Sequence, residues 1–230
     1  MNLEFDSDSF GWVFWVIALA VVGAVAYISY LIEKRRREAF MAMAKRLGLR
    51  YTAKNHNLAS KFGFLDKLCE GSNRYAFNIL DGTYKEHPVC LFDYHYETYS
   101  TDSKGRRQTH HHYFSFFILE HAAHFPELRI YPEGLFSKLG QALGFDDIDF
   151  ESIEFSKSFV VKSSDKKFAY DICHTRMMEH FLKNRSLSLE IEGNCVATWA
   201  DSRLAPEEVP GRLEQLIVIR SLFPDYLYAT

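Results

Sequence analysis

The chain has 230 residues and a net charge of −3, and aromatic residues make up 16% of it. That aromatic content is enough for a packed core and excludes an intrinsically disordered chain. The first ten residues carry a charge of −3, residues 33–50 carry +5, and residues 51–230 therefore carry −5. An acidic body behind a short basic segment excludes the basic surface that nucleic-acid-binding proteins need, so we expect no nucleic-acid partner.

Residues 11–32 form an uncharged apolar stretch, GWVFWVIALAVVGAVAYISYLI. As a helix with a rise of about 1.5 Å per residue, it is roughly 33 Å long, enough to cross a bilayer core of ~30 Å. The charged residues before the stretch are all acidic, and a run of basic residues follows it. Basic flanks stay on the cytoplasmic side. We therefore predict a single-pass protein of the cell inner membrane, with residues 1–10 outside and residues 49–230 as a cytoplasmic body. A cleaved signal peptide is the alternative, but such peptides begin with positive charge.

Residues 33–48 are predicted to continue this helix as a basic stalk, because Phe40 and Leu47 recur at helical spacing and Gly48 can end a helix. The basic collar consists of the four residues Lys34, Arg35, Arg36 and Arg37. We expect the basic collar to contact anionic lipid headgroups; the alternative is that it only fixes the topology. Ala20 and Ala24 form a small-xxx-small pair that would allow two spans to pack as a homo-oligomer.

Hydrophobic periodicity predicts the elements of the body. Strands are expected at residues 49–53, 75–80, 89–99, 109–120, 128–131, 159–162, 187–191 and 195–199, and helices at residues 133–143, 165–183 and 206–222. Asp81-Gly82 is expected to turn one hairpin, Gly193-Asn194 to join two strands, and Ser164 to cap the second helix. The predicted fold class is α+β, a transmembrane helix followed by a mainly antiparallel sheet with packed helices. Residues 49–145 and 146–230 could share one core or form two.

The sharpest cluster of polar residues lies on the hairpin at residues 89–120. Alternate residues of a strand share a face, so Asp93, His95 and Glu97 lie together. If the loop closes symmetrically, Glu97 pairs near His111 and His95 near Tyr113. Two carboxylates and two imidazoles are sufficient ligands for zinc or another divalent metal. The alternative is a solvated polar face with cross-strand Glu–His pairs, and a slip of one residue in register would remove the cluster.

Other ligand-type residues give weaker signals. His121 and His124 are separated as metal-binding helix residues can be, but Pro126 favours a loop there. The cysteines are Cys69, Cys90, Cys173 and Cys195. None of them has CxxC spacing, so we expect buried, reduced thiols and no cofactor.

Several short segments carry a resemblance to a known family. They are Leu91-Phe92-Asp93-Tyr94, Ile130-Tyr131-Pro132-Glu133-Gly134, Phe150 with Glu154-Phe155, residues 161–165, and Arg176-Met177-Met178-Glu179. In these segments the chain resembles a family of uncharacterised bacterial membrane-anchored proteins, in which a basic-flanked N-terminal span precedes a soluble α+β domain. The resemblance extends over most of residues 45–225 and implies a bacterial source. It implies no reaction and no catalytic residues.

An anchor without a catalytic motif predicts a non-catalytic module that binds a protein partner or senses a ligand at the membrane. The first alternative is a metal-dependent hydrolase that uses Asp93, His95, Glu97 and His111. The second alternative is an anionic-lipid-binding module that acts through the basic collar. The sequence leaves open whether the protein is an enzyme and favours a non-enzyme.

Overall fold

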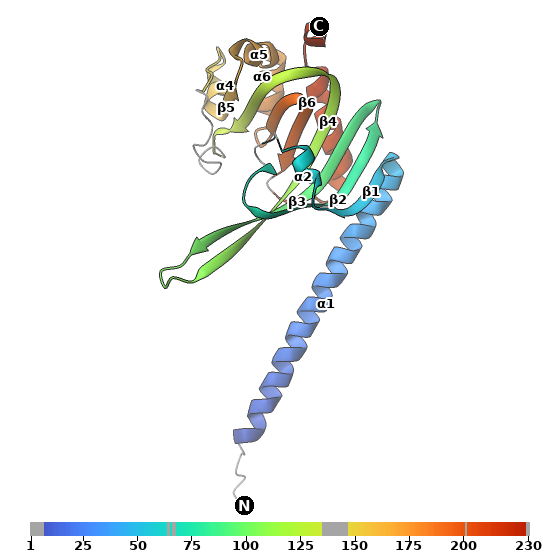
Figure 1. The fold of residues 1–230 in the computed structure, drawn as a ribbon, viewed down its shortest axis with the longest axis vertical. Coiled ribbons are helices and arrows are strands. Elements are labelled where there is room, and N and C mark those ends of the chain that lie inside the picture. The colour runs from blue at the N-terminus through green and yellow to red at the C-terminus, as the bar shows by residue number, and fades with distance from the viewer. Residues whose placement is uncertain (1–6, 64, 66–67, 135–146, 201, 229–230) are drawn as a thin grey trace, which may run out of the picture.

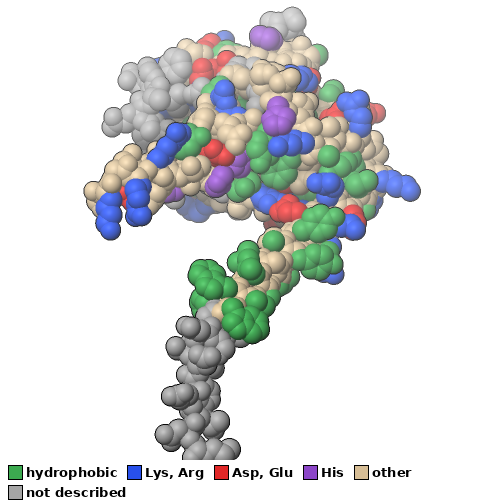
Figure 2. Space-filling view, turned by 60° about the horizontal axis from the view of Figure 1, so that its bottom comes forward, with side chains coloured by type: hydrophobic (Ala, Val, Ile, Leu, Met, Phe, Trp, Pro, Cys, Tyr) green, Lys and Arg blue, Asp and Glu red, His purple; other side chains and the backbone are tan. Residues whose placement is uncertain are grey.

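The N-terminal part of the protein is one long helix, α1 (Ser7–Leu47), in the computed structural model, which describes residues 7–228 except 64, 66–67, 135–146 and 201. Its stretch Phe14–Leu47 contains an 18-residue window with a mean hydropathy of 2.2, and by length and composition it can cross a membrane. Figure 1 shows α1 standing clear of the body. Figure 2 shows apolar side chains on the visible face of this part of the helix, where many large apolar residues are exposed. Predicted span and stalk are thus one continuous helix, and it ends at Gly48, whose φ of +71° suits glycine.

The body is built on one six-stranded antiparallel sheet in the order β1-β2-β3-β4-β5, with β6 also paired to β4. The strands are β1 (Arg50–Asn55), β2 (Ser72–Tyr84), β3 (His87–Thr101), β4 (Arg107–Pro132), β5 (Phe159–Ser163) and β6 (Ser188–Ala200). The helices are α2 (Leu58–Lys61), α4 (Ile153–Ser158), α5 (Lys166–Ile172), α6 (Thr175–Lys183) and α7 (Val209–Ser221), with 3₁₀ turns η2 (Pro206–Glu208) and η3 (Asp225–Tyr228). The predicted α+β class is confirmed. The helix expected at residues 133–143 lies largely outside the described residues.

Strand β4 is the centre of the sheet because it pairs with three other strands, β3, β5 and β6. Residues 115–119 lie between β3 and β6, and residues 128–130 lie between β5 and β6. The separate strands expected at 128–131 and at 187–191 and 195–199 are therefore parts of β4 and β6. Gly193 is not a hairpin turn but a register irregularity opposite Phe125. The pairing of β4 with β5 and β6 joins the halves 49–145 and 146–230 in one sheet.

The turn between β2 and β3 lies four residues later than predicted. Asp81 and Gly82 belong to β2, and the turn is made by Lys85 and Glu86, whose φ angles of +46° and +68° are both positive. Two positive φ angles are typical of the type I′ hairpin turn. Gly82 is needed for another reason, since a Cβ there would lie 3.2 Å from Cδ2 of Leu49, where α1 passes into the sheet.

The helix predicted at 165–183 is two helices, α5 and α6, separated at Cys173 and His174. The buried residues of α5 include Phe168 and Ile172, and those of α6 are Met177 and Phe181. At 100° per residue, Met177 would lie about 140° away from Ile172 on a straight helix. The break therefore turns both apolar stripes towards the core. The cap of α5 is Asp165 rather than Ser164.

Each face of the sheet carries its own hydrophobic cluster. Leu91 and Phe117 belong to the cluster under the end of α1 and under α4–α7. Their neighbours Phe92 and Phe116 belong to the cluster on the opposite face, which also contains Phe62, Leu65 and Leu68 and against which Leu58 of α2 packs. We call the first face the anchor-side face, because α1 packs there through residues such as Phe40.

Figure 1 shows the β3–β4 hairpin projecting from the body on the side from which α1 leaves it. The last described pair between β2 and β3 at this end is Ser72 with Glu97, so the hairpin continues beyond that point as a two-stranded ribbon. The predicted pairing of the two long strands is confirmed. Glu97 lies opposite His111 and His95 lies opposite Tyr113.

Candidate functional site

Polar and aromatic side chains form three cross-strand rows on the anchor-side face. The rows are Phe77–Asp93–Ser115, Tyr75–His95–Tyr113 and Glu97–His111. They exist because the period of a strand is two and the three strands are in register. Moving along the rows from Asp93 to Glu97 is moving from the body towards the projecting ribbon.

Asp93 is the most enclosed member of these rows, with only 1% of the residue exposed. Its carboxylate accepts hydrogen bonds from Nη2 of Arg36 at 2.8 Å, Nδ2 of Asn78 at 3.0 Å and Oγ of Ser115 at 2.7 Å. Oγ of Ser115 also accepts from the backbone N–H of Leu204 at 3.0 Å. This Asp93 network joins α1, three strands and the segment before α7, and it compensates the buried charge.

The Asp93 network corrects two expectations from the sequence. Arg36 was predicted to contact lipid headgroups, but only 14% of its side chain is exposed and its charge is committed to Asp93. Asp93 was predicted to be a metal ligand, but its oxygens are occupied by Arg36, Asn78 and Ser115. Lys34, Arg35 and Arg37 are exposed, so lipid contact by these three residues stays a prediction.

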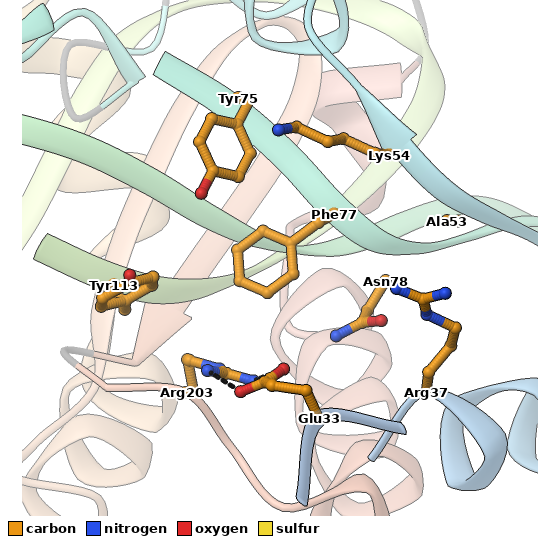
Figure 3. Close-up of a pocket in the computed structure, with 9 residues that line it drawn as sticks. All are labelled: Glu33, Arg37, Ala53, Lys54, Tyr75, Phe77, Asn78, Tyr113 and Arg203. Atoms are coloured by element: carbon orange, nitrogen blue, oxygen red, sulfur yellow. Dashed lines mark hydrogen bonds and ion pairs between the residues drawn. The ribbon is translucent and has the colours of Figure 1, made fainter. Parts of the chain in front are cut away.

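A pocket of about 380 Å³ lies where α1 meets the sheet, and we call it the junction pocket (Figure 3). Its aromatic residues are Tyr75, Phe77 and Tyr113, and its charged residues are Glu33, Arg37, Lys54 and Arg203. In Figure 3, α1 supplies Glu33 and Arg37 to one side of the pocket, and the sheet supplies the aromatic rings. Glu33 is the first residue after the apolar stretch.

Arg203 and Glu33 close one side of the junction pocket. Nη1 and Nη2 of Arg203 donate to the two carboxylate oxygens of Glu33 at 2.8 and 2.9 Å, which is the bidentate arrangement that arginine favours. The Arg203 guanidinium also lies 5.3 Å from the Phe77 ring centroid and 5.7 Å from that of Tyr113. Lys54 lies over Tyr75, with Nζ 3.7 Å from the ring centroid. The walls therefore combine positive charge with aromatic faces.

His95, Glu97 and His111 form a second cluster beside the junction pocket, and we call it the His-Glu cluster. One ligand atom of each residue lies within 4.8 Å of the others. Nε2 of His95 is 3.0 Å from Nδ1 of His111, which is 3.5 Å from Oε1 of Glu97. His95 is buried between the rings of Tyr75 and Tyr113, and this burial lowers the pKa of His95. Three of the four predicted metal ligands are therefore brought together.

The remaining predicted residues lie elsewhere. His121 and His124 are in β4, so the predicted loop there is wrong. Cys90, Cys173 and Cys195 are buried as expected, and burial raises the pKa of the Cys90 and Cys195 thiols to about 12. Cys69 is exposed, contrary to expectation, because it lies in the connection before β2 rather than in a cluster.

The sequence did not indicate Arg203, Asn78 or the aromatic wall of the junction pocket as site residues. Arg203 lies in a connection with no motif, and its partner Glu33 is 170 residues away. Tyr75 and Phe77 were expected only as part of a strand. Their shared side of β2 was a visible signal, because alternate aromatic residues of a strand share a face.

No family model matches the sequence, and no curated protein matches it significantly. The fold is similar to that in the crystal structure of the mycobacterial trehalose monomycolate transport factor A, TtfA, with a TM-score of 0.59. The similarity covers 83% of this chain and 95% of that chain at 14% sequence identity. At this identity the likeness shows a shared fold. It supports the α+β architecture described above.

Proposed function

We propose that this protein is a single-pass membrane protein whose cytoplasmic body is a non-catalytic ligand-binding module, with the junction pocket as its binding site. The observation that carries the proposal is the position of this pocket. Two of its charged residues, Glu33 and Arg37, directly follow the apolar stretch, and the other lining residues belong to the body. With α1 in a bilayer, the pocket would lie at the level of the lipid headgroups.

The chemistry of the junction pocket favours an anionic ligand. It has three cationic side chains and one carboxylate, and Glu33 is already paired with Arg203. Among the described residues, neither Arg37 nor Lys54 forms an ion pair. These two cations can bind a phosphate or carboxylate group, and the aromatic walls can pack against an adjoining ring or chain. The ligand is therefore an anionic head group, either of a membrane lipid or of a soluble molecule of the same chemistry.

Two further observations support a position against the membrane. The projecting ribbon points to the same side as α1 (Figure 1), and its tip carries Lys104, Arg106 and Arg107. Basic side chains are attracted to the anionic cytoplasmic leaflet. The solved structure of similar fold is described as a transport factor, and an accessory role beside a membrane-protein partner suits an anchored module of this shape.

The test is ligand binding by the full-length protein in detergent micelles. The probes are a short-chain phosphatidylglycerol, the matching phosphatidylcholine and inorganic phosphate. We expect the Arg37→Gln variant to bind phosphatidylglycerol at least about 10-fold more weakly, because a charge-assisted hydrogen bond contributes about 1.5–3 kcal/mol. Arg35→Gln is the matched control. It removes the same charge from an exposed residue that neither lines the junction pocket nor pairs with Asp93.

Equal weakening in the two variants would mean non-specific attraction to the basic collar and would contradict the proposal. Binding of phosphatidylglycerol but not phosphate identifies a lipid ligand, and binding of phosphate with similar affinity identifies a soluble anion. Binding of phosphatidylcholine as tightly as phosphatidylglycerol would also contradict the proposal, because the phosphocholine head group carries no net charge.

A further inference from the structure

We propose that His95, Glu97 and His111 bind one divalent transition-metal ion, such as Zn²⁺, at the point where the β3–β4 ribbon leaves the sheet. This inference is independent of the junction pocket and concerns a different ligand. It assigns no reaction to the metal. It rests on the geometry of the three ligand atoms, on the groups that orient them and on access from solvent.

The ligand atoms have the spacing that a small metal ion needs. Two ligands bound to one tetrahedral zinc at 2.0–2.1 Å lie about 3.3 Å apart. The separations of 3.0 Å between the His95 and His111 nitrogens and 3.5 Å between His111 and Glu97 bracket this value. All three atoms lie within 4.8 Å of one another, so a metal ion can bind once the side chains of His95 and Glu97 move closer together around it. Two imidazoles and one carboxylate are a ligand set that zinc and other first-row metals accept.

His95 is held in the tautomer that a metal ligand requires. Its Nδ1 is 3.2 Å from the backbone carbonyl oxygen of Asn73, which can only accept a hydrogen bond. Nδ1 therefore carries the proton, and Nε2 presents its lone pair towards His111. A backbone carbonyl that fixes a histidine in this way is the usual second partner of a metal-binding imidazole. His111 would ligate through Nδ1 with its own proton on Nε2.

Glu97 is positioned by the same residue, Asn73 at the start of β2. Its Oε1 accepts a hydrogen bond from Nδ2 of Asn73 at 2.6 Å, and its Oε2 accepts one from the hydroxyl of Tyr99 at 3.0 Å. Asn73 has a positive φ of 49°, which lets its carbonyl reach His95 while its amide reaches Glu97. Gly71 packs against the backbone of Glu97. Only glycine fits there, because a Cβ would lie 2.5 Å from the Glu97 carbonyl oxygen.

The site is open on one side, so a metal ion can reach it. His95 is 2% exposed, whereas 53% of the His111 side chain is exposed. Three protein ligands leave at least one coordination position for water or for an external ligand. The metal would also join β3 to β4 at Glu97, where the pairing of β3 with β2 ends, and so stiffen the projecting ribbon.

The neighbouring histidines provide a control inside the same run of residues. His110 and His112 point to the opposite face of β4, where Nε2 of His112 is 2.8 Å from Oγ1 of Thr98 and Nε2 of His110 is 2.7 Å from Oγ of Ser100. Replacing His112 removes an imidazole from the chain without touching the His-Glu cluster. Replacing His111 removes the exposed ligand, which is tolerated more easily than a change at buried His95.

The experiment is metal binding by the full-length protein after its affinity tag has been removed. Chelator-treated protein is titrated with Zn²⁺ by calorimetry, and with Co²⁺, whose visible absorption reports tetrahedral nitrogen and oxygen ligation. We expect about one equivalent bound by the wild type and by His112→Ala, and a loss of affinity of at least about 100-fold in His111→Ala. Asn73→Gly keeps the positive φ and removes the amide that holds Glu97, so its affinity should fall about 10-fold.

Hydrogen exchange provides a second readout. Zn²⁺ should slow exchange in residues 98–110 of the wild type and of His112→Ala, but not of His111→Ala. The proposal is overturned if the wild type binds no Zn²⁺ or Co²⁺, or if His111→Ala binds them as tightly as His112→Ala.

Discussion

Among the described residues, two buried carboxylates, Glu190 and Asp93, each pair with an arginine. The two ion pairs join different parts of the protein. Glu190 of β6 is 0% exposed and lies 3.0 Å from Nε of Arg129, its direct cross-strand partner on β4. Asp93 of β3 is 1% exposed and pairs with Arg36 of α1, which is 57 residues away in the chain. The first pair fastens two strands that are already hydrogen-bonded. The second fastens the long apolar helix α1 to the sheet.

The surroundings of the two pairs differ in the same way. Arg129 is 4% exposed in its side chain and also meets Glu127 at 2.6 Å, so this pair is closed to solvent. Asp93 lies beside the junction pocket, since Asn78, which donates to it, also lines that pocket. The same chemistry therefore serves cohesion at one place and a docking joint at the other. The junction pocket thus adjoins the docking joint through Asn78, whereas neither Arg129 nor Glu190 lines it.

The largest effect is expected when the closed pair is broken. Glu190→Ala removes the cross-strand partner of buried Arg129 but leaves Glu127 paired with it. Removing one member of a buried ion pair costs about 3–5 kcal/mol, and the remaining pair places the expected loss at the lower end, about 3 kcal/mol. We expect the free energy of unfolding of the whole body to fall by this amount, measured by chemical denaturation. Glu207→Ala, at an exposed position, is the control and should stay within about 0.5 kcal/mol of the wild type. Equal stability of the two variants would contradict the structural role of the closed pair.

A smaller and more local effect is expected at the docking joint. Asp93→Asn removes the charge that holds Arg36, whose guanidinium still has partial access to water. We expect a loss of about 2–3 kcal/mol, mostly as weaker docking of residues 36–47. Hydrogen exchange is the measurement, and it should accelerate in residues 36–47 while β4 and β6 stay protected. If β4 and β6 open as fast as the stalk, Asp93 is a cohesion residue like Glu190.

The difference between the two pairs explains what the sequence could predict. The uncharged stretch at 11–32 and the alternation in β3 and β4 are local patterns, so the helix and the pairing of Glu97 with His111 were predicted correctly. The partner of Asp93 was not, because the docking of α1 on the sheet is a long-range contact that no local pattern encodes. Arg36 was predicted to contact lipid as part of the basic collar, because its long-range contact with Asp93 leaves no local pattern either.

The errors within the body also have physical causes. Asp81-Gly82 looks like a turn, but the chain uses Gly82 to let Leu49 approach and turns at Lys85 and Glu86. The break between α5 and α6 contains neither proline nor glycine at Cys173-His174. It follows from the phase of the buried residues, which a search for helix-ending residues overlooks.

The smallest effect is expected at His121, a partly buried imidazole that, unlike the two buried carboxylates, has a like charge beside it, that of Arg220. His121 packs against Phe125 and Tyr228, and burial, followed by the positive charge of Arg220, lowers its pKa to about 4. The unfolded state binds a proton near pH 6.5 and the folded state does not, so the stability contributed by neutral His121 is complete above pH 6.5 and is lost as the pH falls towards 4. After discounting for the half-buried position of the ring, we expect a loss of about 1 kcal/mol between pH 7 and pH 5.

His121→Asn should remove that part of the pH dependence of the melting temperature, and His124→Asn, at an exposed position, should keep it. A wild-type slope retained in His121→Asn would assign the acid sensitivity to other groups and leave the two arginine–carboxylate pairs as the first places to look.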